Sequence, residues 1–166
     1  MTEIGQSPTF NLWIDPWVSV ERTGGGLDRV SLEQALLGAH GYRAIYDPSP
    51  LVVVGLHRLL VAILHSALDP RTRAALLALM ADQRFPAQAI VDFGVQYAHR
   101  FDLFSERLPF LQSADLPLFP AKGEDTKSVS QLTLETSRTS ALEHYRHGRA
   151  KDEVFCAPCA AAGLVT

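Results

Sequence analysis

The longest apolar run in the chain, residues 51–68, constrains its fold more than any other feature. Ser49 and Pro50 stand directly before the run, and an N-cap residue followed by proline at the first helical position is typical of a helix start. Three side chains interrupt the run: His57, Arg58 and His65. Because these groups are costly inside a bilayer, we predict a helix from Pro50 to about Leu68 that is buried in a soluble protein and does not span a membrane.

The residues before this helix indicate a β-hairpin. Trp17, Val18 and Val20 favour a strand, which should begin after Pro16 because proline cannot donate to a sheet ladder. Residues 23–26 read Thr-Gly-Gly-Gly, a turn in which positive φ angles are cheap, and residues 27–30 can pair back as the second strand. The tryptophans, with Phe10, are expected in the core.

Short helices are expected on both sides of the long one. Ser31 and Gln34 form a capping-box pattern, which predicts a helix through Ala39, and residues 42–47 are expected to form a connector. Asp69 and Pro70 should cap a helix that extends to about residue 81. We expect its apolar side chains to point inward, namely Leu76, Leu77 and Met80.

A further helix is expected at residues 87–100, after the break at Phe85 and Pro86. Its inward face should carry Ile90, Phe93 and Tyr97. Beyond it, residues 101–104 and 108–111 are apolar but interrupted by charge and proline, so they should pack irregularly.

The predicted fold class is therefore α+β, with an N-terminal β-hairpin, a mainly helical core and an irregular, loop-rich C-terminal part. The 166 residues suit one domain. Residues 120–152 are polar and are expected to form a flexible loop. The sequence ends at Thr166, inside an apolar segment, so we expect residues 1–166 to be one incomplete domain.

The motif with the clearest chemistry is Cys156-Ala157-Pro158-Cys159, in which two thiolates can converge on one metal ion. Four interpretations stay open. The pair is half of a zinc site completed elsewhere, a zinc site completed by His144 and His147, a redox pair, or two thiols without a metal. Only two cysteines are present and the sequence begins without a signal peptide, so a reducing cytoplasm is the expected location.

The stretch directly before the cysteines is locally basic, although the whole chain has a formal charge of −3. Residues 138–151 carry four positive charges and one negative charge, that of Glu143. Its candidate nucleic-acid contacts are Arg138, His144, Tyr145, Arg146, His147, Arg149 and Lys151. The alternative interpretation is a solvated loop, which charge clusters usually are.

Catalytic motifs are missing from the sequence. It contains neither a nucleophile elbow nor a P-loop, a zinc-protease motif or a dinucleotide-binding fingerprint. Gly24 to Gly26 lie between two strands and not before a helix, so they form no anion cradle. We therefore expect a protein that is not an enzyme.

The order of several motifs resembles the CasA family, the large subunit of the type I-E CRISPR surveillance complex known as Cascade. These motifs are FNLWIDPWVSVER, VSLEQALL, PLVVVGLHRLLVAILHSAL, FDLFSERLPFLQ and FCAPC. The similarity extends from Phe10 to Thr166 and corresponds to the first part of the family's N-terminal domain. A longer chain with a C-terminal helical bundle is implied.

This resemblance implies a non-catalytic subunit that recognises the protospacer-adjacent motif (PAM) in target DNA and helps to recruit the nuclease-helicase. It implies contacts of residues 139–152 with PAM-containing duplex and with the 5′ region of the guide RNA, and assembly with the other Cascade subunits. It also implies zinc, bound by Cys156, Cys159 and residues downstream of Thr166.

Two other function classes remain beside this one. The first is a zinc-stabilised protein interaction module without a DNA role. The second is a thiol oxidoreductase that uses Cys156 and Cys159. A gel shift at low and moderate salt separates the DNA-binding subunit from the interaction module, and a reduction assay with Cys156→Ser tests the oxidoreductase.

Overall fold

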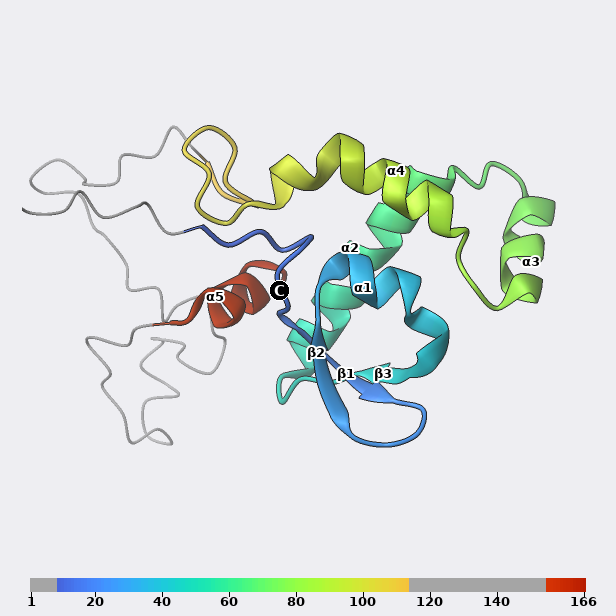
Figure 1. Cartoon of the computed structure of the whole chain (residues 1–166), viewed down its shortest axis with the longest axis horizontal. Helices are drawn as coiled ribbons and strands as arrows, with labels where there is room; N and C mark the ends of the chain where they lie inside the picture. The colour runs from blue at the N-terminus through green and yellow to red at the C-terminus, as the bar shows by residue number, and fades with distance from the viewer. Residues whose placement is uncertain (1–8, 114–154) are drawn as a thin grey trace, which may run out of the picture.

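A three-stranded antiparallel sheet lies near the N-terminus of the computed structural model, which describes residues 9–113 and 155–166 (Figure 1). The strands are β1 (Val18–Arg22), β2 (Leu27–Val30) and β3 (Tyr42–Ile45), in the order β2-β1-β3. The predicted hairpin and its turn are confirmed, because β1 begins after Pro16 and pairs with β2 in the register Val18 to Val30. Gly25 and Gly26 adopt φ angles of 87° and 91°, which other residues reach only with strain.

The connector expected at residues 42–47 is wrong, because residues 42–45 form the edge strand β3. This strand pairs with β1, with Val20 opposite Ile45, and the register shifts between Glu21 and Arg22. Only the two end residues of β3 are even half-buried, so the alternation that marks a strand is lacking. Residues 42–45 are a strand because they pair with β1, and their own sequence does not predict one.

The capping box before the first helix is confirmed. In α1 (Leu32–Leu37), the Gln34 amide donates to Ser31 Oγ at 3.2 Å, and the Ser31 amide donates to Gln34 Oε1 at 3.0 Å. The helix ends at Leu37, two residues earlier than expected. Gly38 caps it, and the 3-10 turn η1 (Ala39–Gly41) follows.

The helices expected after α1 form in the expected order: α2 (Pro50–Leu68), α3 (Arg73–Asp82) and α4 (Ala87–Tyr97), which the 3-10 turn η2 (Ala98–Phe101) follows. A helix that the sequence did not predict, α5 (Ala157–Leu164), follows Cys156. The bounds of α2 are those predicted. The cap of α3 differs: Thr72 Oγ1 accepts from the Ala75 amide at 3.1 Å, whereas Asp69 ends α2 in the left-handed conformation.

The core lies between the sheet, α1, α2 and α4, and the N-terminal aromatic residues are part of it as predicted. Trp13 is 2% exposed, and Trp17 donates from Nε1 to the Leu12 carbonyl at 2.9 Å. The Trp13 ring packs 5.3 Å from Phe93 and 5.5 Å from Phe101, measured between centroids. The expected inward face of α4 is confirmed, since Ile90 is buried and Phe93 and Tyr97 pack against the core.

The segment after η2 packs without regular structure, as the sequence indicated. Phe101, Leu103 and Phe110 are buried, and the Phe101 and Phe110 rings stack at 5.5 Å. An isolated bridge joins Asn11 to Asp102. These contacts hold residues 101–112 against the start of the described chain.

The expected burial of α2 and α3 is partly wrong. Only four residues of α2 are buried, namely Val52, Gly55, Leu56 and Ile63. In α3 no residue is buried, and Leu76, Leu77 and Met80 are 48%, 55% and 74% exposed. Within the described part of the chain, α2 is the one helix long and apolar enough to cross a membrane by length and composition, a test that core helices of soluble proteins also pass.

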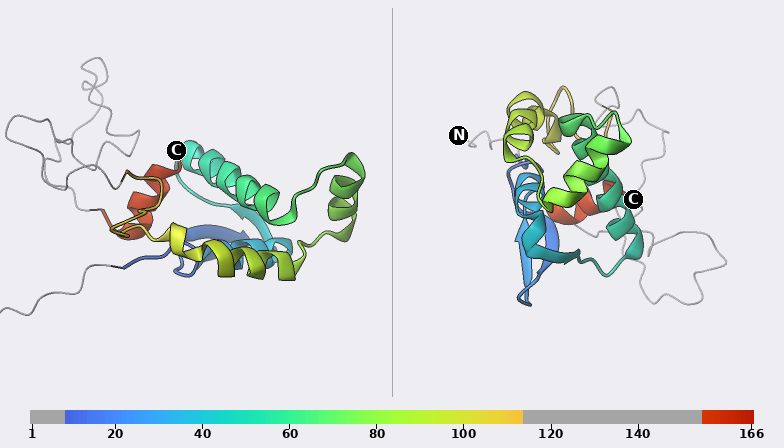
Figure 2. Two further views of the ribbon diagram at one scale, coloured as in Figure 1. Left: turned by 90° about the horizontal axis from the view of Figure 1, so that it is seen from above. Right: turned by 90° about the vertical axis from the view of Figure 1, so that its right-hand side faces the viewer.

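The exposure of α3 follows from its place in the fold. Figures 1 and 2 both show α3 at one end of the molecule, beyond the layer formed by α2 and α4. The repeat of leucines predicted an apolar face correctly. It could not show that the described chain brings nothing against that face.

Candidate metal and nucleic-acid site

The two cysteines lie at the start of α5. The small residues of this helix let it pack close to the core. Cys156 is the N-cap residue, with φ −68° and ψ 154°, and Pro158 lies in the first turn, where a missing amide hydrogen costs nothing. The Ala160 amide donates to the Cys156 carbonyl at 3.0 Å and closes the first turn. The helix therefore holds Cys156 and Cys159 one turn apart.

The far end of α5 is seated on α2 at Gly55. An added Cβ at Gly55 would stand 2.1 Å from the Val165 carbonyl oxygen and 2.8 Å from its carbon. Ala161 and Gly163 are buried in the same helix. Only a residue without a side chain at position 55 permits this approach, so Gly55 fixes where α5, and hence the cysteine pair, lies.

The thiols of Cys156 and Cys159 point toward each other and are both exposed. Their Sγ atoms lie 2.9 Å apart, and no disulfide joins them. Their shared hydrogen bond, the backbone amide of Cys159 and the charge of Arg29 lower the pKa of the Cys156 thiol below its ordinary value. The same hydrogen bond raises the pKa of Cys159, and partial burial adds to that rise.

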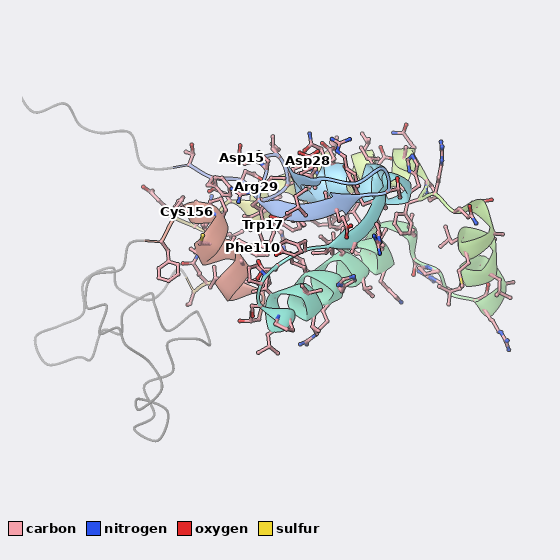
Figure 3. The ribbon with its side chains drawn as sticks, turned by 90° about the horizontal axis from the view of Figure 1, so that it is seen from below. Asp15, Trp17, Asp28, Arg29, Phe110 and Cys156 are labelled. Carbon is pink, nitrogen blue, oxygen red and sulfur yellow. The ribbon has the colours of Figure 1, made fainter. Side chains whose placement is uncertain are left out.

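Charged side chains from distant parts of the sequence influence the pKa values of this pair. Arg29 of β2 stabilises the thiolate form of both cysteines, and Asp47 opposes it at Cys159. Figure 3 shows Cys156 on the same side of the molecule as Arg29 and Asp15. The sequence analysis missed the influence of Arg29, because β2 and α5 lie far apart in the sequence and no local motif links them.

The cysteine pair fits half of a tetrahedral zinc site. Two thiolates bound to one zinc ion stand about 3.8 Å apart, given Zn–S bonds of about 2.3 Å. A small rotation of either side chain reaches that separation from 2.9 Å. Among residues 9–113 and 155–166, no third cysteine, histidine or carboxylate gathers with them to complete a metal site.

The other predicted site residues lie outside the described part of the chain. These are Arg138, His144, Tyr145, Arg146, His147, Arg149 and Lys151. The expected flexible loop at 120–152 also lies there. Of the nine predicted site residues, the structure therefore places Cys156 and Cys159, and it brings these two together.

Comparison with known proteins gives the family. The family model "CRISPR-associated protein Cse1 (CRISPR_cse1)" matches residues 11–166. The CasA/Cse1 protein of Thermus thermophilus is 43% identical over 115 residues, which are 69% of this chain and 23% of that protein. The chain thus spans about a quarter of the length of this curated relative.

Solved structures agree with this match. The crystal structure of Cse1 from Acidimicrobium ferrooxidans superposes with a TM-score of 0.80 at 28% identity, over 97% of this chain and 29% of that chain. A chain of a "CRISPR RNA-guided surveillance complex, pre-nicking" has a TM-score of 0.77 at 22% identity, over 95% of this chain and 33% of that one. The second likeness shows a shared fold. The family match and the Thermus relative together show that this chain belongs to the Cse1 family of CRISPR-associated proteins.

Proposed function

We propose that the protein carrying this chain is a non-catalytic subunit of a CRISPR RNA-guided surveillance complex of the Cascade type. In this proposal it works in the cytoplasm, contacts PAM-containing duplex and the 5′ region of the guide RNA, and helps to recruit the nuclease-helicase. The observation that carries the proposal is the Cse1 family match over residues 11–166. The shared fold with a chain of a surveillance complex agrees with it.

The described residues on both sides of 114–154 are anchored in the core. On one side, the Gln112 side chain donates to the Leu103 carbonyl at 2.9 Å, next to the buried Phe110. On the other side, α5 packs on α2 through Gly55. The described residues that flank 114–154 are thus fixed to the core, and the basic stretch at residues 138–151 is part of the sequence between them.

Zinc is part of the proposal, with Cys156 and Cys159 as two of its four ligands. Structural zinc sites use four ligands, so two further ligands must come from beyond residues 9–113 and 155–166. A bound zinc ion would fix the start of α5 through two thiolates, and Arg149 and Lys151 stand only a few residues before Cys156.

The experiment that tests the DNA role is a charge reversal in the assembled complex. Arg146→Glu with Arg149→Glu should weaken binding to PAM-containing duplex and reduce the slope of log K against log salt by about two, one for each phosphate that the variant no longer neutralises. The control is Arg73→Glu with Arg107→Glu, which changes the net charge equally at two exposed positions far from α5 in the sequence.

The salt series decides between the two function classes. A reduced slope for the Arg146 and Arg149 variant alone supports the DNA contact. Identical curves for the wild-type protein and both variants would remove the basic stretch from the DNA interface. The zinc-stabilised interaction module without a DNA role would then be favoured.

A further inference from the structure

An open apolar groove lies between the second half of α2 and α3, on the side of the molecule away from the cysteine pair. Its volume is about 460 Å³. Among the apolar side chains that line it, from both helices and the segment after α3, are Val61, Leu64, Leu68, Leu76, Met80 and Phe85. Because none of these six is buried, the groove exposes a continuous apolar surface to water.

The helix α3 forms one wall of this groove and has no other support in the described chain. It has ten residues, none of them buried. Isolated helices shorter than about 12–15 residues are marginal in water, so α3 needs tertiary packing to persist. Met80 at 74% exposure is a large apolar side chain without such packing. An exposed apolar patch of this kind marks an interaction surface.

The chemistry of the groove indicates what covers it. Its polar lining residues are His40, His65, Gln83 and Arg84, and no acidic residue lines it. A partner segment therefore needs an apolar face to fill the groove and carboxylates at its edge to meet Arg84. An amphipathic helix laid between two helices satisfies both needs.

We propose that the occupant is an amphipathic segment of the same polypeptide, from the part of the Cse1-family protein that these 166 residues do not span. The chain covers 23% of the Thermus relative and 29% of the Acidimicrobium structure, so most of a family-length protein is available to cover the groove. Permanent interfaces are as apolar as the inside of a domain, whereas interfaces that form and dissociate are more polar. The apolar lining of this groove therefore favours a permanent contact.

Covalent connection also favours this occupant over a separate subunit. A tethered segment binds at a high effective concentration, so a groove of modest size suffices to hold it. Of the proposed function, this inference uses only the family membership, so it holds or fails independently of DNA binding.

The test is hydrogen exchange on the isolated family-length protein, with Met80→Asp as the variant. In the wild-type protein, the amides of α3 should exchange at least about tenfold more slowly than in an unstructured peptide. Met80→Asp should remove that protection and also that of one segment outside residues 1–166, which identifies the occupant. Met80→Leu should retain both. The control is Val95→Asp on α4, an 84% exposed position outside the groove, which should change neither.

Four results would overturn the proposal. The first is rapid exchange of α3 in the wild-type protein. The second is protection that appears only when other subunits are added, which assigns the groove to one of them. Protection that rises with protein concentration would assign the groove to a second copy. The last is a Met80→Asp variant that changes no segment outside residues 1–166.

Discussion

Gly94 is the residue whose replacement tests the packing of the core most sharply. It is buried on α4, directly against the ring of Trp13. A Cβ added at Gly94 would stand 2.5 Å from Trp13 Nε1 and 2.9 Å from its Cε2. Real contacts of this kind essentially never fall below 3.0 Å, so either α4 or the ring must move.

Trp13 has little freedom to move. It is 2% exposed and lies between Phe93 and Phe101, and its backbone amide donates to Asn11 Oδ1 at 3.0 Å. Overpacking of a filled core costs about 1–3 kcal/mol, and more where backbone must shift. Alanine gains about 1 kcal/mol over glycine inside a helix. The clash is severe, so Gly94→Ala should lose about 1–2 kcal/mol of unfolding free energy on balance.

The assay is urea denaturation followed by far-ultraviolet circular dichroism, which reports on the whole fold and not on Trp13 alone. The matched control is Gly41→Ala, because an added Cβ at Gly41 meets no atom within 4 Å. That variant should change stability by no more than about 0.5 kcal/mol. An equal or higher stability for Gly94→Ala would refute the close packing of α4 on Trp13.

Three further predictions concern single residues. Ser31→Ala should cost about 1 kcal/mol of unfolding free energy, because it removes one half of a buried capping box; an unchanged urea midpoint would contradict this. Ile63→Ala should cost about 2–5 kcal/mol, whereas Val54→Ala, at an exposed position of the same helix outside the groove, should stay within about 0.5 kcal/mol. In metal-free protein, iodoacetamide should alkylate Cys156 at lower pH than Cys159, since a lowered pKa keeps the thiolate present at lower pH. Cys159→Ala should move the reaction of Cys156 to higher pH, and an unmoved midpoint would show that the shared hydrogen bond has no such effect.

Local signals predicted the parts of the fold that local physics decides. Ser31 with Gln34 sets the start of α1 through the capping box, and Pro50 at the first helical position sets the start of α2, where the Ser49 side chain makes no capping hydrogen bond. The hairpin was equally predictable from its glycine turn. What the sequence could not predict depends on distant partners. The edge strand β3 exists because β1 lies beside it.

In the candidate site, too, the sequence predicted what neighbouring residues determine and missed what distant residues determine. The spacing of Cys156 and Cys159 predicted that their thiols meet, and one turn of α5 brings them to 2.9 Å. The effect of the Arg29 charge on the pKa of Cys156 depends on the tertiary fold, because β2 and α5 lie far apart in the sequence. The role of the basic stretch at residues 138–151 stays a prediction, because it lies outside the described residues.

The affinity of the assembled complex for target DNA, measured with and without the subunit that carries this chain, tests the proposed function most directly. The guide RNA and the remaining subunits should still assemble without it. Affinity for a PAM-containing duplex should then fall at least about tenfold, and added subunit should restore it. Equal affinity in the two preparations would contradict a DNA-recognition role.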